Sequence, residues 1–365
     1  MLPRNAELWL PSLLTSGRKR RPEVPADSCT EILFCIADHF EPARGNASFA
    51  TQRARVAAWT EHYPPLAAKF RDADGRPPQH TFFYPEEEYH PAHLDEIARL
   101  CRAGLGEVEV HLHHDNDTAD GLRDKLERFK QRLTGHGLLC RDKLDDRIKY
   151  AFIHGDWALD NSRRDRRMCG VDNELTILKE TGCYADFTLP SAPSETQTRT
   201  VNSIYYATDD PVRPKSHDRG RAAAVGREPG GDLLFIQGPL ALDWHARKWG
   251  LLPRLENGSL HGVKPPTADR FRLWVEAGVS VVGQPQWVFV KVYTHGAFEP
   301  DTAVLLGPEM ERFHLEIGHH FNDGRRYRLH YVTAREMANL VHAAEAGERG
   351  DPNEFRDYRL KRPAT

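Results

Sequence analysis

Four residues whose side chains can bind metals occur in a five-residue stretch, His111-Leu112-His113-His114-Asp115. They follow the alternating residues Glu107 to Val110, a pattern typical of a β-strand. Because successive side chains of a strand point to opposite faces, His111 and His113 are expected on one side of the sheet, where both can reach one ion. His114 or Asp115 can then complete the metal shell or orient a ligand from outside it. The spacing predicts a metal centre at the end of this strand.

A second stretch has the same layout. The apolar residues Ile32–Ala37 are followed directly by Asp38-His39-Phe40-Glu41. Histidine and carboxylate are the ligands that Zn²⁺ uses in catalytic sites. Two strand ends that both carry them are what a mononuclear site for Zn²⁺ or another divalent ion would need.

Two further apolar runs end in polar residues. His154-Gly155-Asp156-Trp157 follows the run that begins at Lys149, and His295 comes soon after Val288–Tyr293. In a barrel of parallel strands, side chains at the carboxyl ends face one pocket, so His154, Asp156 and His295 are candidate catalytic residues. Asp156 can instead cap the turn, and both interpretations stay open.

Strand-like and helix-like segments alternate along most of the chain, which favours a single-domain α/β protein with an irregular barrel of seven or eight β/α units. The expected strands are Ile32–Ala37, His80–Tyr84, Glu107–His113, Lys149–His154, Tyr184–Thr188, Ser203–Ala207, Leu233–Gln237, Val288–Tyr293 and Tyr327–Val332. The expected helices are Thr51–Phe70, Pro91–Arg102, Asp117–His136, Asp172–Thr181, Thr267–Ala277, Pro308–Phe321 and Thr333–Ala346.

The domain expected from this pattern covers residues 31–346, preceded by an amino-terminal arm (1–30) and followed by a surface tail (347–365). The 365 residues carry a formal charge of −3, which gives no electrostatic reason to expect nucleic acid as a partner. The six cysteines contain no Cys-x-x-Cys pair and indicate reduced thiols in the cytoplasm. No signal peptide or transmembrane segment is predicted.

The order of these motifs, from about residue 31 to residue 295, resembles the polysaccharide deacetylase superfamily (carbohydrate esterase family 4). The resemblance implies an irregular (β/α) barrel, a zinc-like ion held by one aspartate and two histidines, and a late-strand histidine as general acid. Asp38 matches the aspartate, and His295 matches the late histidine. His111 with His113 or His114 matches the pair, although the family's spacing of four would select Asp115.

The chain departs from the family at the catalytic base. A second aspartate is expected in the first motif, but Cys35 and Ala37 stand in its neighbourhood, and neither accepts a proton usefully. His39, Glu41, Asp156 and His154 are the remaining candidates for the base.

The resemblance implies a metal-dependent N-deacylase that acts on a sugar of a surface polysaccharide or lipopolysaccharide precursor, nucleotide-linked or lipid-linked. Its candidate substrate contacts are Glu86, Trp157, Asn161 and Tyr293. Three alternatives stay open: acyl transfer on such a sugar, glycoside hydrolysis by two carboxylates, and a non-catalytic sugar-binding relative.

Overall fold

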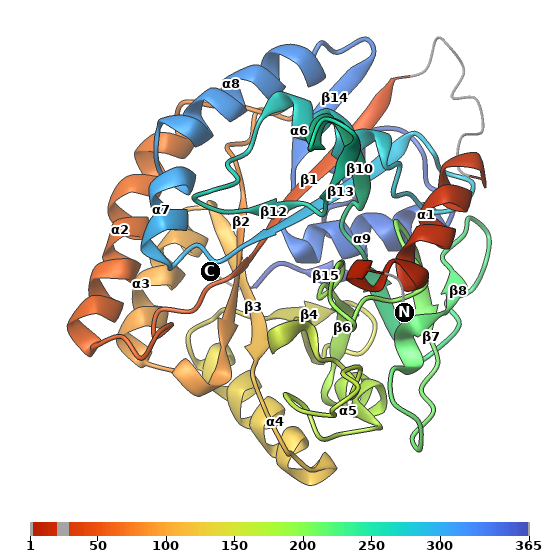
Figure 1. The fold of residues 1–365 in the computed structure, drawn as a ribbon. Coiled ribbons are helices and arrows are strands. Elements are labelled where there is room, and N and C mark those ends of the chain that lie inside the picture. The colour runs from red at the N-terminus through yellow and green to blue at the C-terminus, as the bar shows by residue number, and fades with distance from the viewer. Residues whose placement is uncertain (1–2, 20–28, 364–365) are drawn as a thin grey trace.

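The computed structural model describes residues 3–19 and 29–363, and it has the mixed α/β structure expected from the sequence. A large, mostly parallel sheet runs through the molecule and helices pack around it (Figure 1). The path of paired strands is β12 (Ser259–Leu260), β13 (Trp287–Thr294), β1 (Thr30–His39), β2 (His80–Pro85), β3 (Gly106–Leu112), β5 (Ile148–His154), β6 (Cys183–Asp186), β9 (Leu233–Ile236), β7 (Ile204–Ala207) and β8 (Arg221–Ala222).

Three strands lie off this path: β14 (Tyr327–Tyr331) beside the first half of β1, and β4 (Cys140–Asp142) between β5 and β15 (Leu360–Lys361). The expected helices are present as α2 (Phe49–Ala67), α3 (Pro91–Arg102), α4 (Ala119–Gly135), α5 (Glu174–Thr181), α6 (Ala268–Glu276), α8 (Pro308–Phe321) and α9 (Ala334–Glu345). A reciprocal pair of hydrogen bonds between Thr333 and Glu336 begins α9. Helices α1 (Ala6–Lys19) and α7 (Glu299–Leu305) were not expected.

The sheet is buried on both faces. Ile32, Phe34 and Ile36 of β1 pack in the same cluster as the apolar side chains of the surrounding helices, on what we call the outer face. Leu33 and Cys35 point the other way, to the inner face. A parallel sheet covered on both sides reads as continuous apolar sequence, which is why β1 shows no alternation.

Helix α9 packs against the inner face near the amino ends of the strands. Thr333, just before the helix, donates to Glu107 at the start of β3 (2.9 Å), and the Ala334 amide donates to Thr81 of β2 (3.0 Å). The Arg335 guanidinium also binds Glu107 (2.8 Å). The helix is buried over nearly its whole circumference. The inner face is therefore filled at this end, and its polar side chains gather at the other.

The sheet differs from a wholly parallel arrangement at one end, where β7 runs antiparallel to β8 and β9. The two ends of the strand path approach each other through residues 279–282: Phe289 of β13 donates to the Val279 carbonyl (2.8 Å), and Val282 donates to that of Ala223 (2.9 Å). These are isolated hydrogen bonds, and closure into a barrel stays a prediction. The hairpin of β10 (Ala241–Lys248) and β11 (Leu252–Glu256) was not expected from the sequence.

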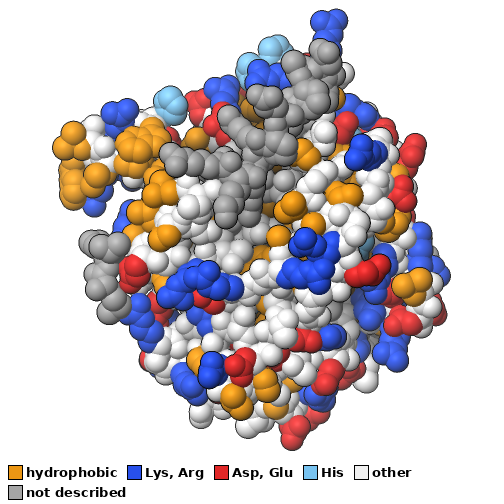
Figure 2. Space-filling model, turned by 90° about the vertical axis from the view of Figure 1, so that its right-hand side faces the viewer, with side chains coloured by type: hydrophobic (Ala, Val, Ile, Leu, Met, Phe, Trp, Pro, Cys, Tyr) orange, Lys and Arg blue, Asp and Glu red, His pale blue; other side chains and the backbone are white. Residues whose placement is uncertain are grey.

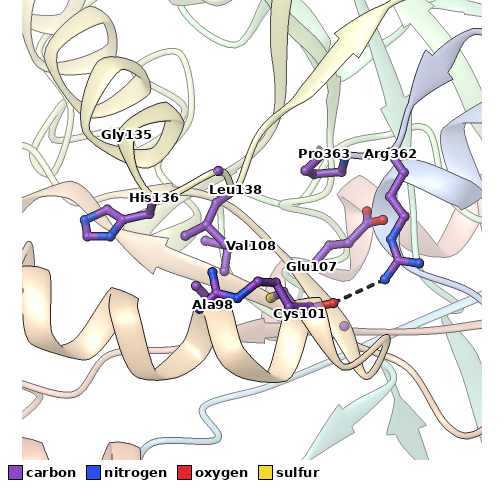
Figure 3. A pocket seen from close by; sticks show the side chains of 12 residues that line it. Ala98, Cys101, Glu107, Val108, Gly135, His136, Leu138, Arg362 and Pro363 are labelled. Atoms are coloured by element: carbon purple, nitrogen blue, oxygen red, sulfur yellow. Dashed lines mark hydrogen bonds between the residues drawn. The ribbon is translucent and has the colours of Figure 1, made fainter. Parts of the chain in front are cut away.

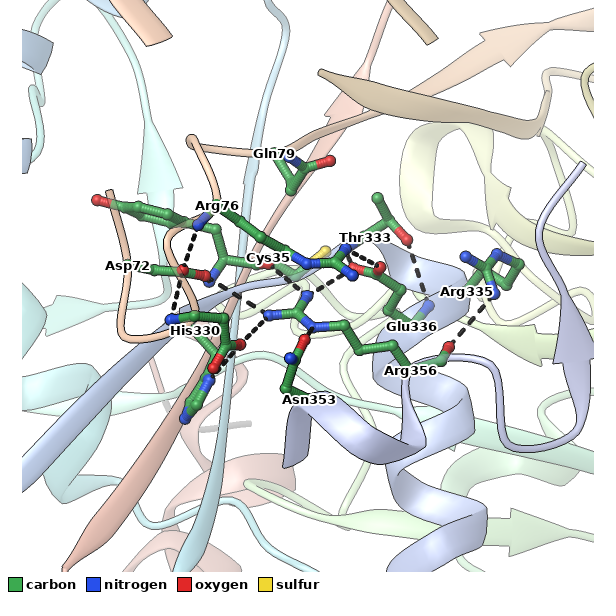
Figure 4. Close-up of polar contacts among 12 residues, drawn as sticks. Cys35, Asp72, Arg76, Gln79, His330, Thr333, Arg335, Glu336, Asn353 and Arg356 are labelled. Atoms are coloured by element: carbon green, nitrogen blue, oxygen red, sulfur yellow. Dashed lines mark hydrogen bonds and ion pairs between the residues drawn. The ribbon is translucent and has the colours of Figure 1, made fainter. Parts of the chain in front are cut away.

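The carboxyl-terminal segment, predicted as a surface tail, is anchored to the body of the protein by a few of its residues. Strand β15 pairs with β4, and the Arg356 side chain is 3% exposed. Its guanidinium donates to Glu336 (2.9 Å) and Asp74 (2.6 Å), at the centre of the network in Figure 4. Charged residues can be buried when they are paired, and these ion pairs hold the polar segment against the body.

Helix α1 lies on the body of the protein through Trp9, which packs against Val201 and Leu240. Positive and negative side chains are interspersed over the face shown in Figure 2, and no single-sign patch dominates it. Hydrophobic and basic side chains project together at the upper left of that view. Within residues 3–19 and 29–363, no helix has the length and apolar character needed to cross a membrane.

Candidate metal centre

Histidines from three strand ends meet around one glutamate on the inner face. His39 ends β1 and Glu41 follows it, His111 and His113 lie at the end of β3, and His295 follows β13. We call these five residues the mouth cluster. Their strands are neighbours in the parallel sheet apart from the intervening β2, so their carboxyl ends meet at one edge.

Glu41 is the centre of the mouth cluster. Its Oε1 lies 3.2 Å from His111 Nε2 and 3.6 Å from His113 Nε2. Nitrogen and oxygen ligands of a tetrahedral zinc ion lie roughly 3.3 Å apart, given bonds of about 2.0–2.1 Å. His39 and His295 also have ligand atoms within 4.8 Å of each other and of Glu41. The donor types and spacings therefore suit a divalent ion.

The far nitrogens of two imidazoles are held by acceptors. His111 Nδ1 lies 2.8 Å from the Ile153 carbonyl, and His113 Nδ1 lies 2.5 Å from Glu87 Oε1. Both acceptors require a proton on Nδ1, so each Nε2 is left to face Glu41, where it donates a proton or binds an ion. A histidine fixed in this way by a carbonyl or carboxylate is the usual companion of metal ligation.

The electrostatics of the mouth cluster favour an ionised Glu41 and neutral rings for His39 and His295. Burial opposes the charge of Glu41, but the imidazoles of His111, His295 and His113 outweigh it and lower the pKa of Glu41. Burial lowers the pKa of His39 well below its usual value, and the adjacent imidazoles lower it further. Burial also lowers the pKa of His295 to about 4, against the attraction of Glu41.

Aromatic residues and a glycine border the cluster. The rings of Trp157 and Tyr293 lie 6.2 Å apart, and Tyr293 lies 6.0 Å from the His39 ring. The buried Trp157 Nε1 has no hydrogen-bond partner among the described residues. A Cβ on Gly155 would lie 2.2 Å from His113 Cδ2, so only glycine leaves room for that imidazole.

Asp38 does not join the histidines, and its assignment as a metal ligand is wrong for this structure. Its Oδ2 lies 2.8 Å from His80 Nε2, and its Oδ1 accepts from the Gly296 amide (2.5 Å). Asp38 follows Ile36 on the outer face, whereas His39 follows Ala37 on the inner face. Because successive side chains of a strand point to opposite faces, Asp38 lies on the opposite side of the sheet from His39.

His114 and His154 are also separated from the mouth cluster. His154 pairs in register with Leu112, which faces outward, and His114 Nε2 lies 2.9 Å from His154 Nε2. Both belong to a buried group with Cys169 and Glu174. They therefore cannot be the ligand and the catalytic base of the mouth cluster that the sequence predicted.

Among the other predicted residues, Asp156 lies close to the mouth cluster, whereas Glu86, Asn161 and Asp115 bind other residues of the protein. Burial opposes a charge on His113, but Glu87, then Glu41 and the exposed Asp156 outweigh it and raise the pKa of His113. Glu86 binds Arg128 (2.8 Å). Asn161 donates to Asp172 (2.8 Å), and Asp115 accepts from the Met168 amide (2.6 Å). Glu86, Asn161 and Asp115 thus have structural partners, so the predicted substrate and ligand roles are not supported for them.

The sequence indicated His39 and Glu41 only as candidate bases, and it gave no sign that Glu87 is the partner of His113. One signal was available, because His39 and Glu41 share the spacing of two that marked His111 and His113. What was lacking was the orientation of β1, whose two apolar faces look alike in the sequence.

A well-formed pocket lies away from this chemistry (Figure 3). Its volume is about 280 Å³, and it is lined by Cys101, Glu107, His136 and Arg362 among others. Gly106 and Glu107 begin β3, whereas His111 is near its end, so this pocket is at the opposite end of the strand. The Glu107 carboxylate is already bound by Arg335, and we do not assign the pocket a catalytic role.

Comparison with known proteins names no relative: no family model matches this chain, and no curated protein matches it.

Proposed function

We propose that the mouth cluster binds one divalent metal ion, with zinc the best fit to its donors, and that the protein is a metal-dependent amide hydrolase. Glu41, His111 and His113 are the proposed ligands. The observation that supports this most strongly is the fixed orientation of the two histidines: the Ile153 carbonyl and Glu87 hold their Nδ1 atoms, and both Nε2 atoms face Glu41. A site with only three protein ligands leaves a position for water or substrate.

A divalent ion held there would polarise an amide carbonyl and make a water molecule more acidic. His295 is partly exposed at the mouth and lies beside His39 (4.9 Å between ring centroids). We assign it to accept the proton released by the attacking water and to return that proton to the departing nitrogen. One proton thus moves from water to the amine as the C–N bond breaks, and the acyl group leaves as the acid.

The proposed substrate is an N-acylated sugar of a surface polysaccharide or its precursor, and this part rests on the resemblance of the motifs. Trp157 supports it, since its partly exposed ring lies beside the cluster and can pack against a sugar. Tyr293 is buried beneath that ring, and its hydroxyl accepts from Asn257 (3.1 Å), so it would support Trp157 rather than contact the sugar. Acyl transfer would use the same residues with an acceptor other than water.

The test measures metal content and acetate release from N-acetylglucosamine oligosaccharides by the full chain loaded with zinc. His113→Ala should lose the ion and the activity, because it removes a ligand whose side chain is only partly buried (34% exposed). His295→Ala should retain the ion and lose about 10²–10⁴-fold in kcat. His319→Ala, an exposed histidine of α8, is the matched control.

Cleavage of glycosidic bonds that persists after chelation would instead indicate a glycoside hydrolase. Oligosaccharide binding without any product would indicate a non-catalytic relative. Either result refutes the amidase proposal.

A further inference from the structure

A second set of metal-binding side chains lies outside the mouth cluster, on the outer side of the sheet. His114 follows β3, His154 ends β5, Cys169 lies in the loop before α5, and Glu174 is the first residue of that helix. We call these four residues the buried cluster. All four are buried, and one ligand atom from each lies within 4.8 Å of those from the other three.

The spacing within the buried cluster is that of atoms around one small ion. His114 Nε2 lies 2.9 Å from His154 Nε2 and 3.4 Å from Glu174 Oε1, and Glu174 Oε1 lies 3.6 Å from His154 Nε2. Ligands on a tetrahedral zinc ion lie roughly 3.3–3.7 Å apart, the larger value applying to sulfur. Two imidazoles, a thiol and a carboxylate supply four donors that zinc accepts.

The hydrogen bonds of the His114 and His154 rings leave two Nε2 atoms facing each other without a proton between them. His114 Nδ1 lies 3.1 Å from Asp117 Oδ2, and His154 Nδ1 lies 2.5 Å from the Gly155 carbonyl. Both acceptors place the proton on Nδ1. Two neutral rings would therefore direct their Nε2 lone pairs at each other across 2.9 Å, which is unfavourable unless a proton or a cation lies between them.

Glu174 and Cys169 are oriented toward the same point. Glu174 Oε2 accepts from the Asp160 amide (2.6 Å), whereas its fully buried Oε1 has no hydrogen-bond partner among the described residues. The Cys169 sulfur accepts from the amides of Asn161 and Val171, each at 3.4 Å. These amides would stabilise the thiolate that metal binding requires. Without an ion, burial raises the pKa of the thiol, which can donate to Glu174 Oε2 (3.3 Å).

A single shared proton satisfies the buried cluster only in part. That proton can be donated along the 2.9 Å contact to His154 or toward Glu174 Oε1 at 3.4 Å, but it cannot be given in full to both acceptors. A cation at the centre contacts Glu174, Cys169 and both imidazoles together.

We infer that the buried cluster is a structural zinc site with Cys169, His114, His154 and Glu174 as its four ligands. It is independent of the proposed function, because four protein ligands leave no position for a substrate. Binding would release the Cys169 thiol proton and join the ends of β3 and β5 to the start of α5. His113 and Gly155 are adjacent in sequence to two of these ligands, so the site also fixes the backbone that presents the mouth cluster.

Metal analysis and X-ray absorption of the full chain, purified and loaded with zinc, test the inference. His113→Ala removes a mouth ligand only, so its remaining zinc should number one per chain and show one sulfur neighbour at about 2.3 Å with nitrogen or oxygen neighbours at about 2.0–2.1 Å. Cys169→Ala should lose one zinc per chain and the sulfur signal, and Cys29→Ala, a cysteine outside the cluster, should lose neither.

If Cys169→Ala does not fold, the spectrum of His113→Ala decides the matter by itself. Zinc without a sulfur neighbour, or a fully folded His113→Ala protein without zinc, would overturn the buried site. The proposed function fails separately, when wild-type protein shows the sulfur-ligated zinc but no second ion and no hydrolysis.

Discussion

Replacing Gly155 with alanine tests whether the position of one imidazole controls the mouth cluster. The new Cβ would lie 2.2 Å from His113 Cδ2, whereas carbon atoms in contact are normally at least about 3.5 Å apart. The His113 ring must therefore move by roughly 1.3 Å, the difference between these distances. Its Nδ1 bond to Glu87 and its approach to Glu41 cannot both survive such a shift.

We expect Gly155→Ala to fold, to bind less zinc at the mouth, and to lose about 10²-fold in hydrolysis, the usual consequence of a 1 Å misplacement. Zinc titration of the metal-free protein and acetate release measure the two effects. Gly318→Ala in α8 is the matched control, since its new Cβ meets nothing within 4 Å and should leave both quantities unchanged. Unaltered zinc affinity and turnover in Gly155→Ala would refute the role assigned to His113.

Three further predictions concern stability. Gly296→Ala should lower the free energy of unfolding by about 3 kcal/mol or more, measured by urea denaturation, because its Cβ would lie 2.1 Å from the Asp38 carboxylate; a loss below about 1 kcal/mol would contradict the packing. Burial opposes a charge on His330, but Asp74 and Glu31 bind its two nitrogens and raise its pKa. The stability that charged His330 contributes is therefore complete below the unfolded pKa of about 6.5 and is lost as pH rises through the folded pKa. His330→Gln should flatten this fall of the unfolding free energy with pH, and identical pH profiles of the two proteins would refute the assignment. Chelation should lower the unfolding free energy by about 2.7 kcal/mol for each site that is occupied in free zinc at 100 times its Kd. Equal stability would argue against both metal sites.

Much of the fold could be predicted because its strands and helices have strong local patterns. Helices α3 and α8 have the predicted bounds, and the chemistry at the ends of β1, β3 and β13 was visible in the sequence. The predicted position of Asp38 failed for a specific reason. Both faces of β1 are apolar, so the sequence shows where the strand ends but not whether Asp38 or His39 points inward.

The buried cluster could not be predicted because it depends on strand register and on a loop. Leu112 pairs with His154, and only this pairing shows that His154 faces outward beside His114. Cys169 lies in irregular chain and Glu174 resembles an ordinary residue of a helix start. The β10–β11 hairpin was missed because its strands alternate poorly, so the glycine of its short turn, Gly250, did not stand out.

The position of α9 has a consequence for how the protein is made. This helix and β15 are among the last described residues to be synthesised, yet they contact β3, β4 and the Glu107 carboxylate, which are made some 200 residues earlier. A chain still attached to the ribosome without them would leave an apolar surface uncovered and Glu107 without its arginine. Folding of the earlier strands should therefore remain incomplete, and prone to aggregation, until translation has passed this helix.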